Sequence, residues 1–144
     1  MRTYLSPHFT LEEMLASPAA VRLGIDNIPS AEVIETLRKT AAGMEEVRTL
    51  LGNRPINVNS GYRNPAVNSA LHGRPNSQHM SGEAVDFTCM AFGNPYEVIN
   101  AIIASNIKYD QVIVEYGHWV HISFSEQNRL QALLIDFRGT SDYA

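Results

Sequence analysis

The sequence predicts an α+β fold in which N-terminal helices pack on a central antiparallel β-sheet. Apolar residues recur at helical spacing in the first third of the chain, whereas later segments alternate with a period of two, which is typical of strands. Helices that mostly precede the strands favour this arrangement over one in which helices and strands alternate. We expect residues 1–144 to form a single domain, since this length fits one compact core.

Two helices are expected before residue 53. The first begins after Thr10, which can form a capping box with Glu13, and it ends near Ser17 and Pro18. The second runs from Ser30, which can act as its N-cap, to Gly52. Its apolar residues recur at steps of three, four and seven, which predicts a face turned to the core. They are Val33, Ile34, Leu37, Ala41, Met44, Val47 and Leu51.

The remaining expected elements are short. Alternating residues predict strands within 55–63, 83–89, 109–117 and 119–125, and the last two are separated by a tight turn typical of a hairpin. Short helices are expected within 64–71 and 94–106, each with a proline near its start. Residues 73–82 have the composition of a loop. The apolar run 130–137 is ambiguous, and we interpret it as the final strand.

Composition excludes some classes of function. The formal net charge is −4, and no basic patch indicates nucleic-acid binding. The N-terminus has no apolar segment typical of a signal peptide, and no apolar run is long enough for membrane insertion. The single cysteine, Cys89, excludes an internal disulfide. We therefore expect a protein made in the cytoplasm without a signal peptide, and we expect it to be a monomer.

The segment SQHMSGEAVDF, residues 77–87, contains the first candidate site. His79 lies in a loop, Asp86 interrupts an apolar strand, and His121 lies on a later strand. Two imidazoles and one carboxylate form a common set of ligands for catalytic zinc, with a fourth position for water. A bound metal would also compensate a buried carboxylate. The spacing alone leaves a second interpretation open, in which His79 is a surface-loop residue and Asp86 a strand-edge carboxylate.

Three motifs, SGYRNPAVN, SQHMSGEAVDF and WVHIS, occur in this order and cover most of the chain. Together they resemble the zinc D-Ala-D-Ala carboxypeptidases and L-alanyl-D-glutamate endopeptidases, which cleave peptidoglycan peptides. HFTLEEMLAS and RLGIDNIPS are similar to the N-terminal part of the stand-alone phage-type members. The resemblance implies a hedgehog/DD-peptidase-like fold and a Zn²⁺ cofactor held by His79, Asp86 and His121. It also implies that Arg63 binds a substrate carboxylate or oxyanion, and that Ser77 supports the ligand loop near the substrate.

The chain departs from the family pattern at the proton-transfer residue. Relatives usually place an acidic residue three positions before the last zinc histidine, where this chain has His118. Glu115 is the nearest carboxylate, and a bend at Gly117 would bring it within reach, so Glu115 is our first candidate base and His118 the second. Trp119 shares a strand face with His121 and is a candidate wall of the substrate cleft.

These observations predict a zinc-dependent peptidase that hydrolyses peptidoglycan stem peptides or cross-links. The expected bond is D-Ala-D-Ala or L-Ala-D-Glu, and the expected partner is the peptide of the cell wall, in a bacterial or a phage-encoded lysis system. The alternative is a module of the same fold that binds zinc or wall peptides without cutting them. A phage structural component is a third interpretation.

Overall fold

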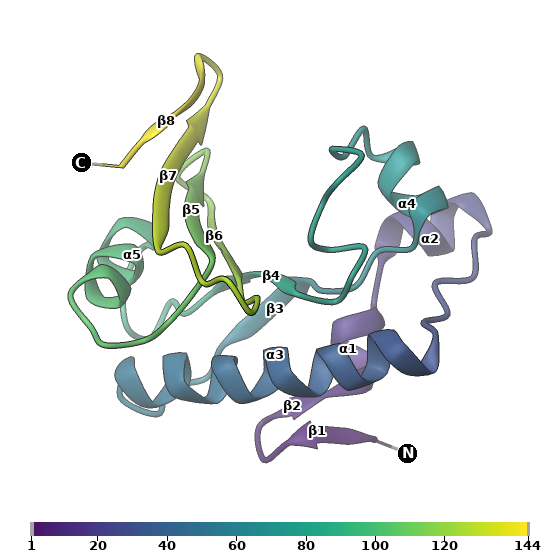
Figure 1. Ribbon diagram of the computed structural model, residues 1–144, viewed down its shortest axis with the longest axis horizontal. Helices are drawn as coiled ribbons and strands as arrows, with labels where there is room; N and C mark the ends of the chain where they lie inside the picture. The colour runs from purple at the N-terminus through teal and green to yellow at the C-terminus, as the bar shows by residue number, and fades with distance from the viewer. Residues whose placement is uncertain (1, 144) are drawn as a thin grey trace.

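The computed structural model describes residues 2–143 and is a mixed α+β fold (Figure 1). Thirteen helices and strands follow one another along these residues. In chain order they are β1 (Tyr4–Ser6), β2 (Phe9–Thr10), α1 (Leu11–Leu15), α2 (Pro18–Leu23), α3 (Ala31–Leu50), β3 (Asn57–Ser60), α4 (Pro65–Ala70), β4 (Ala84–Thr88), α5 (Pro95–Ile103), β5 (Gln111–Glu115), β6 (Trp119–Ser123), β7 (Gln131–Asp136) and β8 (Gly139–Asp142).

The capping residues predicted for the N-terminal helices lie where expected. The Thr10 hydroxyl accepts a hydrogen bond from the backbone of Glu13, whose carboxylate accepts one from the Thr10 backbone, so the capping box of α1 is complete. Ser30 caps α3 through the backbone N–H of Val33. The chain does not become irregular at Ser17, however. Ser17 caps a second short helix, α2, which begins at Pro18 and was not predicted.

The main sheet has six strands in the order β3-β4-β6-β5-β7-β8. All neighbours are antiparallel except β5 and β7, which run parallel, so the prediction of an antiparallel sheet is right for four of the five strand pairs. The run 130–137 is a strand but not the final one, because β8 follows it and forms the exposed edge. The turn between β5 and β6 contains three residues, Tyr116, Gly117 and His118.

Helices α3 and α5 and the main sheet form one hydrophobic core. The buried face of α3 contributes Leu37, Met44 and Val47, which belong to the predicted apolar stripe. Cys89 lies in this core as a free thiol. Figure 1 shows α3 running beneath the sheet, with the β7–β8 hairpin rising on one side and α4 on the other. No helix among residues 2–143 has the length and apolar character that a membrane span requires.

Candidate metal centre and cleft

The sheet brings together three side chains that are distant in the sequence. Asp86 on β4 and His121 on β6 are direct partners across an antiparallel pair, and such partners have their side chains on the same face. His79 belongs to the loop before β4 and folds back over this face. One ligand atom from each of these residues lies within 4.8 Å of the other two, and all three residues are buried.

The Asp86 carboxylate is the centre of this cluster. Its Oδ1 atom lies 3.2 Å from Nε2 of His79 and 2.9 Å from Nδ1 of His121. The two imidazole rings meet edge to face, with their centroids 5.0 Å apart. Two nitrogens therefore converge on one carboxylate oxygen from different directions.

The hydrogen bond on the far side of His79 shows why this cluster fits a metal ion. Nδ1 of His79 lies 2.6 Å from the carbonyl oxygen of Gly61, and because a carbonyl can only accept, Nδ1 carries the proton. In the neutral ring, Nε2 then directs a lone pair at the carboxylate of Asp86. The lone pairs of Nε2 and of the carboxylate oxygen repel each other unless a cation lies near them. A metal-bound histidine usually donates its other ring N–H to a carbonyl or carboxylate, as His79 does here.

Burial and neighbouring charges set the ionisation of the cluster. Burial lowers the pKa of His79, which favours the neutral ring that a metal requires. Burial alone would raise the pKa of the Asp86 carboxyl, whereas positive charge at the imidazole positions and the hydrogen bond from His121 hold the pKa well below its usual range. With His79 neutral, a metal ion bound between these residues would supply that charge. The site thus combines an ionised carboxylate with an imidazole that resists protonation. This donor set is one that zinc prefers.

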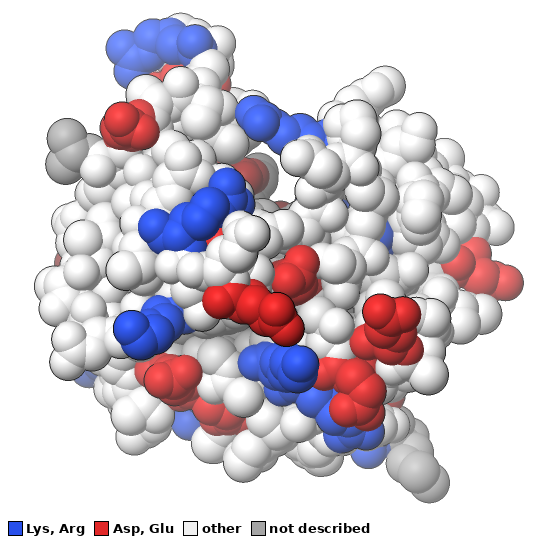
Figure 2. Space-filling view, viewed as in Figure 1, with Lys and Arg blue, Asp and Glu red and all other residues white. Residues whose placement is uncertain are grey.

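The cluster lies at one side of a cleft of about 940 Å³. Figure 2 shows the hollow between the β7–β8 hairpin and the side of the molecule that carries α4, with acidic and basic side chains around it. Alternate residues of β5, namely Gln111, Ile113 and Glu115, face the cleft, and Leu133 and Ile135 of β7 continue this surface. The lining thus continues from the histidines of the cluster along β5 and β7 to Thr140 of β8.

Two residues predicted to belong to the site, Arg63 and Ser77, contact the loop that carries His79. The backbone N–H of Arg63 donates to the carbonyl of His79 at 3.0 Å, and the Arg63 side chain lines the cleft. Its Nε atom is buried without a hydrogen-bond partner among residues 2–143. Ser77 also lines the cleft, and its hydroxyl accepts a hydrogen bond from the backbone of His79 at 3.2 Å. Both residues therefore contact the segment that carries the first ligand.

The two candidates for proton transfer lie in different environments. Glu115 lines the cleft, two residues along β5 from Ile113, which pairs with His121. Burial raises the pKa of its carboxyl, and the nearby charge of Asp86 raises it further. His118 is exposed in the turn and is not part of the cleft lining.

Trp119 was predicted as a candidate cleft wall, and it lies next to a residue that lines the cleft. Its ring packs beside Tyr116, with centroids 6.1 Å apart, and it is not among the residues that line the cleft. Glu115 and Trp119 are register partners at the end of the β5–β6 hairpin. The tryptophan therefore lies beside the candidate base Glu115.

Several residues of the cleft were missed by the sequence analysis. Gln78, Asp110 and Arg129 form a polar network, and all three line the cleft. A polar residue just before an apolar strand, as Asp110 is, looks like an ordinary loop residue. Little in the sequence indicated the network, because contacts among residues 78, 110 and 129 follow no regular spacing along the chain.

Comparisons with known proteins agree with this geometry. A family model described as Peptidase M15 matches residues 7–123. A stretch of 43 residues, 30% of this chain, is 42% identical to the "Zinc D-Ala-D-Ala carboxypeptidase" of Streptomyces albus G. That match covers 17% of the longer relative, so it concerns only a part of that protein. Since the family model covers most of the chain and the ligand set fits, the chain belongs to the peptidase M15 family, whose cofactor is zinc.

Proposed function

We propose that this protein is a zinc-dependent peptidase that hydrolyses peptide bonds of peptidoglycan, either D-Ala-D-Ala or L-Ala-D-Glu. The observation that carries the proposal is the buried convergence of His79, Asp86 and His121 at the side of a cleft of about 940 Å³. Membership of the M15 family and the local similarity to a zinc D-Ala-D-Ala carboxypeptidase support the reaction class and the substrate. We further propose the hedgehog/DD-peptidase-like variant of the α+β fold, acting on the cell wall.

His79, Asp86 and His121 would hold the zinc ion. When bound, zinc polarises a carbonyl and lowers the pKa of a bound water molecule. The chain itself orients these ligands. The carbonyl of Gly61 accepts a hydrogen bond from Nδ1 of His79, and Nδ1 of His121 lies within hydrogen-bond distance of the Asp86 carboxylate. Burial of the three residues keeps bulk water from the ligand atoms.

Glu115 is the proposed proton-transfer residue. It faces the cleft on β5 near the strand position opposite His121, and its raised pKa brings it closer to neutral pH. In this role its carboxylate takes a proton from the attacking water and gives it to the leaving amine. His118, the second candidate, has no comparable position because it is exposed outside the cleft lining.

Arg63 is the proposed binder of a substrate anion. Its guanidinium lines the cleft, and its buried Nε has no partner among the described residues. Such a group donates to a terminal carboxylate or to the oxygen that becomes negative during hydrolysis. Ser77 has a supporting part, since its hydroxyl holds the backbone of His79.

The experiment that tests this proposal is mass spectrometry of purified peptidoglycan after digestion. We expect new amino groups and shortened stem peptides, loss of this activity with a chelator, and its return when zinc is added. The masses of the products identify the bond. Zinc bound without any cleavage would instead support the non-catalytic module, and cleavage that resists chelation and survives in His79→Ala would contradict the metal mechanism.

A further inference from the structure

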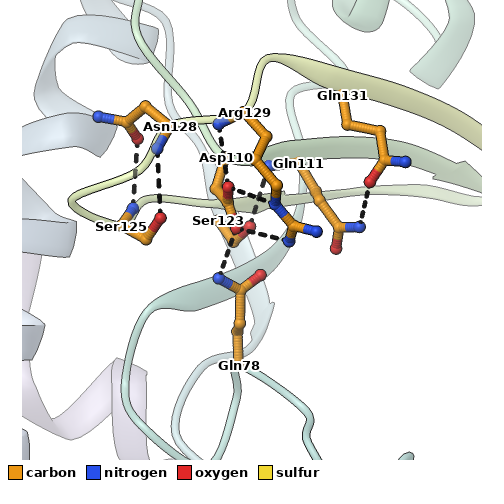
Figure 3. A network of polar contacts seen from close by, with 8 residues as sticks. All are labelled: Gln78, Asp110, Gln111, Ser123, Ser125, Asn128, Arg129 and Gln131. Atoms are coloured by element: carbon orange, nitrogen blue, oxygen red, sulfur yellow. Dashed lines mark hydrogen bonds and ion pairs between the residues drawn. The ribbon is translucent and has the colours of Figure 1, made fainter.

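A second buried carboxylate lies in the cleft apart from the metal cluster. The Asp110 side chain is 2% exposed and accepts four hydrogen bonds (Figure 3). One comes from the Gln78 side chain at 2.8 Å, and three come from the backbone N–H, Nε and Nη2 of Arg129 at 3.0, 2.8 and 2.8 Å. Every donor points at the carboxylate, so Asp110 is fully satisfied within the chain.

This network joins two parts of the cleft. Gln78 directly precedes the ligand His79, whereas Arg129 belongs to the segment between β6 and β7. Asp110 itself precedes β5, and its backbone carbonyl accepts from the N–H of Gln131. Asp110 therefore fixes the side chain of Arg129 relative to the metal cluster.

The guanidinium of Arg129 is held by one edge only. Asp110 binds the edge formed by Nε and Nη2, and Nη1 has no hydrogen-bond partner among residues 2–143. The side chain is 50% exposed and lines the cleft. Because the guanidinium is planar, a carboxylate that grips one edge also fixes the direction of the remaining N–H groups. They can only donate, so a ligand at this position must be an acceptor, and a carboxylate gains most from a charged donor.

The strand register gives the distance from the metal cluster. Ile113 lies opposite His121, and Asp110 precedes Ile113 by three residues. At roughly 3.3 Å per residue of extended chain, the backbone positions of Asp110, just before β5, and Ile113, within β5, are about 10 Å apart. An extended peptide spans this distance in about three residues. The group bound by Arg129 would thus lie about three residues from the hydrolysed bond.

The segment that carries Arg129 lies beyond the residues that match the family model. That match ends at residue 123, whereas the wall formed by Arg129, Leu133 and Ile135 follows it. This wall is therefore a feature of the present chain that the match does not describe. It is the place in the cleft where selectivity can differ while the ligand set stays the same.

We propose that Arg129 is a specificity-determining residue that binds an internal carboxylate of the peptide substrate, about three residues from the hydrolysed bond. The inference rests on the proposed peptidase function. In a stem pentapeptide of the form L-Ala-γ-D-Glu-L-Lys-D-Ala-D-Ala, the free carboxylate of the D-glutamyl residue is the only internal one. It lies on the third residue from the D-Ala-D-Ala bond, so the proposal favours this bond over L-Ala-D-Glu.

The test compares two pentapeptides that differ only in this group, the D-glutamyl peptide and its D-isoglutaminyl counterpart, in which an amide replaces the carboxylate. For the zinc-loaded wild-type protein we expect KM to be about two- to fivefold lower for the carboxylate peptide, because one partly exposed charged hydrogen bond is worth about that ratio. The kcat values should be equal, since the contact lies away from the reacting bond.

The variant Arg129→Gln should lose this preference, with little change in KM for the amide peptide. Arg138→Met is the matched control, because Arg138 forms a similar ion pair with Asp136, at 3.0 Å, outside the cleft lining. It should keep the full preference. Arg129→Lys retains the charge without the planar fork, so it should keep only a part of the preference, and it serves as the second variant if Arg129→Gln does not fold.

The outcomes separate this inference from the proposed function. Cleavage of both peptides with equal KM by the wild type overturns the inference and leaves the peptidase function standing. A full preference in folded Arg129→Gln or Arg129→Lys, or an equal rise of KM for both peptides, also overturns it. If neither pentapeptide is cleaved and peptidoglycan is cut only between L-Ala and D-Glu, the inference alone is overturned. If peptidoglycan also stays intact, the peptidase function is overturned and the inference with it.

Discussion

Asp86 and Asp110 are both buried carboxylates, yet their surroundings differ in one decisive respect. Asp110 contacts the guanidinium of Arg129, a permanent cation within the chain. Among residues 2–143, the ion-pair and hydrogen-bond partners of the Asp86 side chain are two imidazoles, which carry no permanent charge. Burying a carboxylate is costly unless a cation compensates it. The comparison teaches that folding itself supplies the cation beside Asp110, whereas the cation beside Asp86 would be the metal ion that we propose for this site.

The largest expected difference between the two sites is in metal binding. Replacing Asp86 by Asn removes a ligand and should lower zinc affinity by at least about 100-fold, since even partners of metal ligands cost 10- to 100-fold. The matched change Asp110→Asn should leave zinc affinity within a few-fold of the wild type. Competition with a chromogenic chelator measures both. Equal losses in the two variants would contradict the division between a metal site and a structural site.

The next expected effect concerns Glu115, which faces the Asp86 side of the cleft. Glu115→Gln keeps the shape of the side chain and removes proton transfer, so kcat should fall by about 10²- to 10⁴-fold. Zinc content and KM should change little. Steady-state kinetics on a stem peptide, together with elemental analysis, check this prediction. A kcat near the wild-type value would remove Glu115 from the mechanism.

Asp110 should matter for stability, and its effect depends on pH. Hydrogen bonds from Arg129 hold the pKa of this carboxyl well below its usual range, despite the opposing effect of burial. Its stabilisation is therefore complete above the unfolded pKa of about 4 and is lost as the pH falls through the folded value. At pH 7, Asp110→Asn should lower the free energy of unfolding by about 2 kcal/mol.

Chemical denaturation of the zinc-free wild type and of Asp110→Asn at pH 7 and pH 3 measures this effect. Groups that titrate in both proteins contribute equally to the two free energies of unfolding. The difference between these free energies therefore reports the effect of Asp110. It should be smaller at pH 3 than at pH 7. A difference that stays constant or grows as the pH falls would contradict the assignment of this stability to the ionised carboxylate.

The smallest expected effect is that of His118. This residue is exposed in the turn between β5 and β6 and does not line the cleft. His118→Ala should change kcat by no more than about twofold, as is usual for surface substitutions. The same kinetic assay checks it. A loss as large as that of Glu115→Gln would show that the turn moves into the cleft during the reaction.

Local patterns were sufficient to predict most of the fold. The capping box at Thr10 and Glu13 and the apolar stripe of α3 involve residues close in the sequence, and both are present. The parallel pairing of β5 with β7 was not predicted, because nothing in either strand specifies its neighbour. The helix α2 was missed since Pro18 was interpreted only as an end, although Ser17 before a proline is also a start signal.

The sequence predicted the role of Asp86 but not that of Asp110. Asp86 belongs to a motif with His79 at a recognisable spacing, so a resemblance to a family could indicate it. Asp110 contacts residues 32 positions before it and 19 positions after it, and only the folded sheet brings them together. The contact of Trp119 with Tyr116 likewise depends on the shape of the β5–β6 turn, which the alternating pattern of a strand does not predict.

The central claim is that His79, Asp86 and His121 bind one zinc ion. The most direct measurement is the zinc content of the purified wild-type chain and of His79→Ala, combined with X-ray absorption at the zinc edge. We predict one zinc per wild-type chain, coordinated by nitrogen and oxygen only, and little zinc in His79→Ala. Equal zinc in both proteins, or a sulfur ligand that could come only from Cys89 or a methionine, would contradict the account.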